Sequence, residues 1–116
     1  MKGTLIAAMS IGKAAQDEFH DWYDTEHLPE LEAEFNEWYD KEHIPALSAV
    51  PGVLCARRFR GTSGNRKYVA LYHLATPEVQ ESAEWKQARQ SDWTSRLQPH
   101  FRDHLRLVLR RYVRGR

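Results

Sequence analysis

The chain contains one sequence unit twice. Residues 18–31 read EFHDWYDTEHLPEL, residues 34–47 read EFNEWYDKEHIPAL, and nine of the 14 aligned positions are identical at an offset of 16. The two copies together hold two of the four Trp, two of the five Tyr and three of the six His in the chain. Much of the aromatic and ionisable chemistry therefore lies in this repeat, which is the first candidate for a functional segment.

Length and composition limit what the chain can be. Its 116 residues, 1–116, can form one domain with a hydrophobic core. The net charge of +1 gives no general attraction to nucleic acid or to a membrane surface. The apolar run Leu5–Met9 is too short for a signal peptide or a membrane span. We expect a cytoplasmic protein with no nucleic-acid partner and no membrane partner.

Acidic and basic residues are unevenly distributed along the chain. Residues 14–50 hold 11 acidic groups and one basic group, whereas residues 51–116 hold 14 of the 17 Lys and Arg. This pattern favours an acidic helical face that lies near a basic sheet or tail. The alternative is that the C-terminal arginines bind an anion or RNA, but no aromatic stacking motif accompanies them.

Hydrophobic periodicity predicts an α+β fold. Strand-like runs cover residues 4–11, 53–60, 68–74 and 104–113, and helix-like patterns cover 14–27, the second copy to His43, 77–89 and 91–97. The resulting order is strand, helix, extra helix, strand, strand, helix, strand. This is the ferredoxin-like plan, a four-stranded antiparallel sheet with helices on one face. The other face then needs cover, which a second copy of the chain could supply.

The last predicted strand has two different faces. Alternation places Leu105, Leu107 and Leu109 on one face and Arg106, Val108 and Arg110 on the other.

The repeat predicts an extra helix next to the one that the fold requires. In each copy Phe, Trp, Tyr, Glu and His fall on one helical face. An offset of 16 residues rotates a continuous helix by about 160° beyond whole turns, so the two faces would point in nearly opposite directions. We therefore expect a helix break at Pro29, because it would allow both copies to be buried. The extra helix could pack on its own chain, pack on a partner chain, or compete with the other copy for one position.

The second copy supplies the candidate catalytic residues. His43 has an unperturbed pKa near neutrality and lies one helical turn from Tyr39, so the pair could perform general acid–base chemistry. Phe35 and Trp38 would form an apolar wall for a flat substrate. The structural alternative is that the aromatic stripe is core and that His43 is a hydrogen-bonded structural residue.

Three further residues are candidates for substrate binding. His27 and Trp22 occupy the positions of His43 and Trp38 in the first copy. His73, in the strand expected at residues 68–74, is a candidate for the cavity wall.

Other site motifs are weak or absent. His20 with Asp24 or His27, and His100 with His104, match neither an HExxH motif nor a facial triad, so we expect no metal site. No Walker loop, Rossmann fingerprint, GxSxG elbow or Cys/His nucleophile pair is present. These observations argue against nucleotide-dependent chemistry and against hydrolysis by those arrangements.

Two segments resemble a known family. EFNEWYDKEHIPALSAVPGVLCARRFR (Glu34–Arg60), followed by KYVALYHLATPEV (Lys67–Val79), resembles the EthD-like family of the dimeric α+β barrel superfamily, most specifically in WYDxEHxP followed by PGV and a strand. The resemblance implies a ferredoxin-like subunit, a homodimer or higher homo-oligomer with facing sheets, and a cavity between sheet and helices. Superfamily relatives include isomerases, polyketide cyclases, dehydratases, monooxygenases and haem-binding enzymes, many without a cofactor. In several of them a His and a Tyr do acid–base work, which by the motif points to His43 and Tyr39.

Together these observations predict a cofactor-independent enzyme of the lyase, isomerase or cyclase type. Its small-molecule substrate would be a hydrophobic aromatic or polyketide-like compound, with His43 as the acid–base residue and Tyr39 as its hydrogen-bonding partner. Two alternatives stay open. One is a haem- or metal-dependent monooxygenase with His27, His43 or His73 as ligand. The other is a non-catalytic binding or assembly module in which the extra helix makes subunit contacts.

Overall fold

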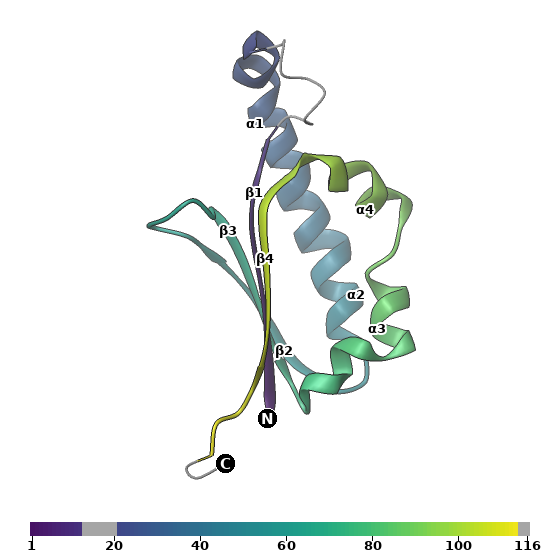
Figure 1. The fold of residues 1–116 in the computed structure, drawn as a ribbon. Coiled ribbons are helices and arrows are strands. Elements are labelled where there is room, and N and C mark those ends of the chain that lie inside the picture. Colours follow the sequence, from purple (N-terminus) through teal and green to yellow (C-terminus); the bar gives the residue numbers. More distant parts are fainter. Residues whose placement is uncertain (13–20, 114–116) are drawn as a thin grey trace.

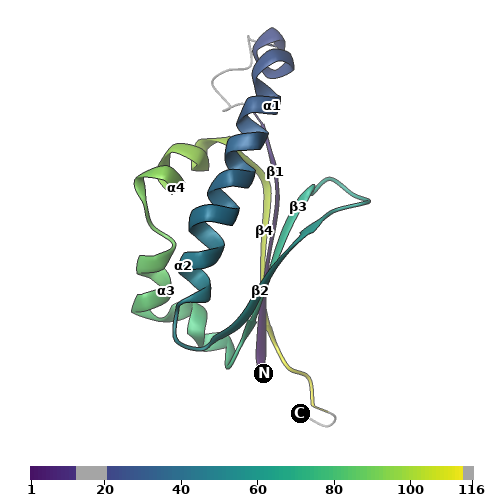
Figure 2. The same cartoon turned by 180° about the vertical axis from the view of Figure 1, so that it is seen from behind.

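Four strands form one antiparallel sheet in the order β2-β3-β1-β4 (Figure 1). The computed structural model describes residues 1–12 and 21–113, with the backbone alone for residues 21–27. The strands are β1 (Gly3–Ile11), β2 (Val53–Arg60), β3 (Tyr68–Leu74) and β4 (Phe101–Arg110). The described helices lie on one side of this sheet (Figures 1 and 2). This strand order with a one-sided helical layer is ferredoxin-like, so the predicted fold class is confirmed.

The helical layer has a long part and a short part. The long part runs from α1 (Asp21–Trp38) through a π-helical segment, η2 (Tyr39–His43), into α2 (Ile44–Ser48). The short part comprises the 3₁₀ segment η3 (Pro77–Glu81), α3 (Ala83–Ala88), α4 (Asp92–Leu97) and the 3₁₀ segment η4 (Gln98–His100). None of the described helices is both long and apolar enough to cross a membrane.

Two serines divide the short part into separate helices. The Ser82 and Ser91 side chains accept hydrogen bonds from the backbone N–H groups of Trp85 and Thr94, which caps α3 and α4. The cap at Ser82 explains why the single helix predicted for residues 77–89 is instead a 3₁₀ turn followed by α3. The short helix predicted for residues 91–97 is confirmed as α4 with its cap.

The predicted break at Pro29 is wrong, because α1 continues through this residue. A proline inside a helix removes one backbone hydrogen bond and costs about 3 kcal/mol. The downstream turns offset that cost by burying Phe35 and Trp38 against the sheet. The second copy therefore occupies the helix position over the sheet, and the N-terminal end of α1 extends past α4 (Figure 2). The start of the helix predicted for residues 14–27 lies outside the described residues.

The core lies between the long helical part and the sheet. From the helices, Phe35, Trp38, Tyr39 and Leu47 are buried. Alternate residues of β3 face them, because successive strand residues point to opposite sides. These are Tyr68, Ala70, Tyr72 and Leu74.

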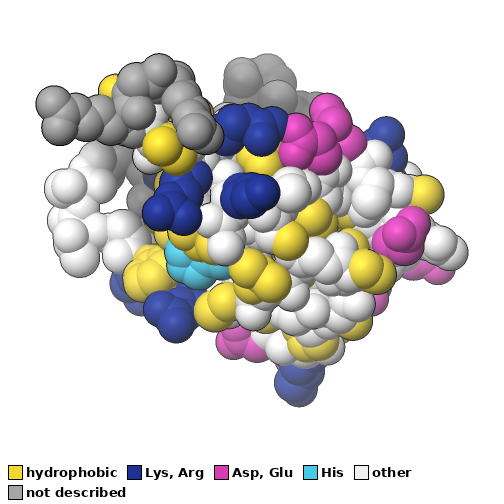
Figure 3. Space-filling model, turned by 90° about the horizontal axis from the view of Figure 1, so that it is seen from below, with side chains coloured by type: hydrophobic (Ala, Val, Ile, Leu, Met, Phe, Trp, Pro, Cys, Tyr) yellow, Lys and Arg dark blue, Asp and Glu magenta, His cyan; other side chains and the backbone are white. Residues whose placement is uncertain are grey.

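The other face of the sheet is apolar and carries no described helix. Leu105, Leu107 and Leu109 of β4 stand opposite Ala8, Ile6 and Thr4 of β1. The residues between them, Arg106 and Val108, stand opposite Ala7 and Leu5 on the covered face, which confirms the alternation predicted for this strand. Figure 3 shows a different side, the lower end of the molecule in the view of Figure 1, where hydrophobic side chains also reach the surface beside Lys and Arg side chains.

The neighbouring strand β1 sets the limits of β4. The sequence predicted a strand at residues 104–113, whereas β4 covers Phe101–Arg110. Ile11 pairs with Phe101 and Gly3 pairs with Arg110, so β4 extends only as far as its partner offers backbone hydrogen bonds. Side-chain alternation alone carries no information about these two ends.

Candidate active site

A cavity of about 860 Å³ lies between the helical layer and the covered face of the sheet. This volume falls within the range of small-molecule sites. The long helical part lines it with Trp38, Tyr39, His43 and Leu47, and the sheet lines it with Ala7, Met9, Tyr72, Phe101, His104 and Arg106. The region between Arg89 and Gln98 forms the remaining wall. Aromatic, imidazole and guanidinium groups from three parts of the chain thus face one space.

The π-helical segment brings three rings of the second copy into contact. In a π-helix the backbone hydrogen bonds join residues i and i+5, and such segments are frequent at functional sites. The His43 imidazole stacks on the Trp38 indole, five residues earlier, with centroids 4.4 Å apart and an interplanar angle of 26°. It also meets the Tyr39 ring edge to face, at 5.2 Å and 89°. Tyr39 and His43 are therefore in ring contact, but the described residues show no hydrogen bond between them, and the closer partner of the imidazole is the Trp38 indole.

The His43 imidazole is uncharged at neutral pH. Burial lowers its pKa to about 4, and the positive charge of Arg89 acts in the same direction. Within the described part of the chain, no group forms a hydrogen bond with this ring. An uncharged imidazole has one nitrogen that accepts a proton and one that donates. His43 lines the cavity and can therefore act there as a proton acceptor or as a hydrogen-bond donor.

Tyr39 is a hydrogen-bond donor rather than a base. Burial raises the pKa of its phenol to about 12, and the opposing effects of the Tyr72 hydroxyl and the Arg58 charge do not cancel this rise. The Arg58 guanidinium lies 4.6 Å from the centre of the Tyr39 ring and is itself paired with Asp40. The phenol thus keeps its proton throughout the physiological pH range.

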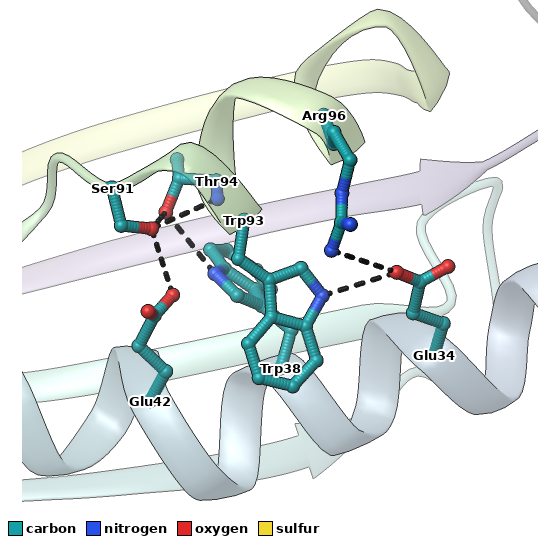
Figure 4. A network of polar contacts seen from close by, with 7 residues as sticks. All are labelled: Glu34, Trp38, Glu42, Ser91, Trp93, Thr94 and Arg96. Carbon is teal, nitrogen blue, oxygen red and sulfur yellow. Dashed lines mark hydrogen bonds and ion pairs between the residues drawn. The ribbon is translucent and has the colours of Figure 1, made fainter.

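A chain of hydrogen bonds fixes the indole that supports His43 (Figure 4). Trp38 Nε1 donates to Thr94 Oγ1 at 3.1 Å, the hydroxyls of Thr94 and Ser91 lie 2.9 Å apart, and Ser91 Oγ lies 2.8 Å from Glu42 Oε2. The Glu42 carboxylate can only accept, so Ser91 donates its single hydroxyl proton to it and Thr94 donates to Ser91. The direction of every bond is then determined, from the indole to the carboxylate. This arrangement links η2 to the start of α4.

A second set of polar contacts joins α1 to α4 beside the first (Figure 4). Trp93 Nε1 donates to Glu34 Oε1 at 3.2 Å, and Arg96 Nη2 approaches the same oxygen at 3.3 Å. Glu34 is about half-exposed, so the ion pair itself contributes little. The contacts of Glu34 with Trp93 and Arg96 fix the position of α4 along α1, which continues into the segment that carries His43.

The sequence pattern did not place a basic wall in the cavity, although Arg106 belongs to the C-terminal arginines that were considered as anion binders. Arg89, His104 and Arg106 line the cavity together with His43. The alternation of β4 separates Arg106 from the leucines, but it does not reveal which face the helices cover. His100 and His104 were weighed only as a weak metal-ligating pair, and they do not share a helix face. Their four-residue spacing is not helical, because η4 ends at His100 and His104 lies in β4.

Two of the predicted binding residues lie away from the cavity wall. Phe35 is fully buried behind it, where its ring packs on Trp38, Tyr39 and Tyr68 at centroid distances of 5.7, 5.2 and 4.8 Å. His73 points to the open face of the sheet, because its neighbour Tyr72 points to the cavity. Phe35 therefore supports the wall from the core, and the placement predicted for His73 is wrong.

The first copy contributes no described side chain to the cavity. Trp22 and His27 belong to α1, but their side chains lie outside the described residues. Across the described residues there is also no group of three or more His, Cys, Asp and Glu side chains that could hold a metal ion.

No family model and no curated protein match the chain. Solved structures do match it over nearly its whole length. The haem degrader MhuD from Mycobacterium tuberculosis, with two haems bound in its active site, matches at 18% identity over 96% of each chain, with a TM-score of 0.57. SnoaB, a cofactor-independent oxygenase from Streptomyces nogalater, matches at 11% identity over 99% of this chain and 98% of its own, with a TM-score of 0.53.

An EthD family protein from Bacillus halodurans is also among the structural matches. It shows 13% identity over 97% of this chain and 100% of its own, with a TM-score of 0.50. At such identities the likeness shows a shared fold and does not transfer an activity. The fold is thus the one that the WYDxEHxP resemblance implied, the ferredoxin-like fold that this chain shares with EthD and haem-degrading proteins.

Proposed function

We propose that the protein is a cofactor-independent enzyme of the lyase, isomerase or cyclase type that acts on a hydrophobic aromatic or polyketide-like compound. The observation that carries this proposal is the uncharged His43 imidazole, which has no hydrogen-bond partner among the described residues and lines a cavity of about 860 Å³. The aromatic wall of Trp38, Tyr39 and Phe101 suits a flat apolar substrate.

The proposed step is a proton transfer. His43 takes a proton from a carbon next to a carbonyl group, and the electron pair of the broken C–H bond moves into the carbonyl to give an enolate. Tyr39 donates a hydrogen bond to the oxygen that becomes negative. The enolate beside it raises the pKa of the new imidazolium, which then returns the proton to another atom or to a leaving group. Isomerisation, cyclisation and elimination can all follow from this intermediate.

The test is deuterium exchange without any added cofactor. A panel of aromatic β-dicarbonyl compounds is incubated in heavy water, and exchange at the acidic carbon is followed by mass spectrometry. We expect the protein to accelerate exchange on at least one compound and His43→Ala to reduce the rate by about 10²–10⁴-fold. His73→Ala is the matched control, since it removes an imidazole from the opposite sheet face, and its rate should equal that of wild type. Exchange at the buffer rate for the whole panel, or undiminished exchange by His43→Ala, would contradict the proposal.

A haem-dependent oxygenase is the second candidate function. It is favoured by the free His43 nitrogen, because a neutral imidazole is a common iron ligand, and by the shared fold with MhuD. Titration with haemin, followed by the visible absorption band, separates the two functions. Saturable binding that shifts the band and disappears in His43→Ala would favour the oxygenase.

We also propose that a second copy of the chain covers the open sheet face. Leu107 and Leu109 are 40% and 42% exposed there, and Phe59 on β2 is 51% exposed. Large apolar side chains are thus exposed at both edges of this face, on β4 and on β2, and such a surface is typical of an interface. Two such faces would form a homodimer with facing sheets.

A further inference from the structure

One wall of the cavity collects positive charge from separate parts of the chain. Arg89 lies at the C-terminal end of α3, whereas His104 and Arg106 lie on β4. All three line the cavity together with His43. Burial lowers the pKa of Arg106 and the charge of Arg89 lowers it further, while the charge of Arg106 adds in the same way to the effect of burial on His104. These groups therefore lie close enough to repel one another.

No carboxylate of the described chain neutralises this wall. Arg106 donates a hydrogen bond to Gln80 Oε1, which is an uncharged partner. Asp92 is the acidic residue among the described lining, and it forms no ion pair with Arg89 or Arg106.

What sets Arg89 and Arg106 apart is that both line the cavity, where no carboxylate of the described chain pairs with them. Arg58, Arg96 and Arg110 are each paired with a carboxylate, Asp40, Glu34 and Glu78 respectively. Arg89 and Arg106 are both exposed residues, so water screens part of the repulsion between their guanidinium groups. A bound anion would remove the repulsion that remains. A purely structural role would give no reason to place two unpaired guanidinium groups at the same wall.

We propose that Arg89 and Arg106 form a subsite for the carboxylate group of an aromatic acid. A guanidinium group offers parallel N–H donors that match the two oxygens of a carboxylate. The rings of Trp38, Tyr39 and Phe101 line the same cavity and can hold the aromatic body of that acid. The inference rests on the proposed function, because it assigns the substrate class of the same cavity. The carboxylate would orient the substrate so that its reacting carbon lies at His43.

Binding of naphthoate and of naphthamide, its uncharged isostere, tests the subsite. Calorimetry at neutral pH measures both affinities for wild type, for Arg89→Gln and for Arg106→Gln. We expect wild type to prefer naphthoate by about tenfold or more, the range of a hydrogen-bonded charge pair, and each variant to lose most of this preference. Affinity for naphthamide should change less than threefold in both variants, roughly the effect of a surface substitution. Arg106→Lys keeps a positive charge and should retain part of the preference.

The matched control is Arg57→Gln, which removes an exposed guanidinium from the opposite sheet face. Its preference for naphthoate should equal that of wild type. Equal binding of the two probes by wild type, undiminished preference in the Arg89 and Arg106 variants, or no binding of naphthoate would overturn the subsite. This result is independent of turnover. Charge-dependent binding without deuterium exchange would leave the subsite standing and reject the reaction, whereas exchange without charge-dependent binding would reject the subsite alone.

Discussion

The Trp38 indole connects His43 to Thr94: it stacks on the imidazole at 4.4 Å and donates a hydrogen bond to the threonine hydroxyl at 3.1 Å. Trp38 is 1% exposed, so its N–H has no access to water. The orientation of the imidazole therefore depends on a residue of α4 that never touches it. This dependence gives the first prediction.

Thr94→Val should destabilise the protein by about 1–3 kcal/mol, because the buried N–H of Trp38 loses its acceptor while the side-chain volume is kept. The unfolding midpoint in urea measures this change. Thr62→Val, in the exposed loop between β2 and β3, is the matched control and should unfold like wild type. Equal stability of Thr94→Val and wild type would show that the indole bond contributes nothing.

The buried His43 should make the protein less stable in mild acid. Its pKa is about 4 in the folded chain and near 6.5 in the unfolded chain, so the unfolded state binds more protons between these pH values. The stability contribution is complete above about pH 6.5 and is lost as the pH falls towards 4, in total about 3 kcal/mol.

His43→Gln tests this pH dependence, because glutamine does not titrate. Urea unfolding at a series of pH values should show a smaller loss of stability for His43→Gln than for wild type across that window. Parallel curves for the two proteins would mean that His43 is not the group responsible.

Gly52 should tolerate no side chain. Its φ of 95° lies in the left-handed region, and a Cβ there would lie 2.5 Å from Val79 Cγ2. Gly64 has a similar φ of 79° but no atom within 4 Å of that position. Gly64→Ala should cost about 1–2 kcal/mol from backbone strain alone, and Gly52→Ala should cost about 1–3 kcal/mol more.

Thermal or urea unfolding of the two glycine variants measures the difference. Adding Val79→Ala to Gly52→Ala should recover part of the extra cost, because it removes the clashing methyl group. Equal destabilisation by the two alanine substitutions would contradict the clash.

The open sheet face should be sensitive to charge. Leu107 and Val108 are neighbours in β4 with similar exposure, 40% and 38%, but they point to opposite faces. If a second copy covers the open face, wild type sediments as a dimer and Leu107→Glu sediments as a monomer, whereas Val108→Glu stays dimeric. A monomeric wild type, or a dimeric Leu107→Glu, would exclude this interface.

Sequence patterns predicted the bounds of a strand well where its own side chains determine them. The bounds of β2 and β3 agree with those expected, because both runs are dense in residues that fit a pleated surface. The ends of β4 were wrong by three residues at each terminus, since they depend on pairing with β1. The helix break predicted at Pro29 was wrong for a similar reason, because the tertiary packing of Phe35 and Trp38 outweighs the local effect of a proline.

The candidate site was predicted in part. The helical spacing of the second copy brought Trp38, Tyr39 and His43 to one place, and the structure has these rings in contact. Alternation in β3 and β4 yields two faces but does not identify the one that the helices cover. For that reason His73 was a candidate for the cavity wall, whereas Arg106 was considered only as one of the C-terminal arginines that could bind an anion.

The proposed function depends on an uncharged His43 imidazole at the wall of the cavity. An NMR titration of this ring measures its charge state directly. The His43 resonance is assigned by its absence in His43→Gln and is followed from neutral to acidic pH. We expect this imidazole to have a pKa of about 4, well below the ordinary histidine value of 6.5. A midpoint near 6.5 would show that burial does not lower the pKa of His43, and it would contradict the uncharged imidazole on which the proposed function rests.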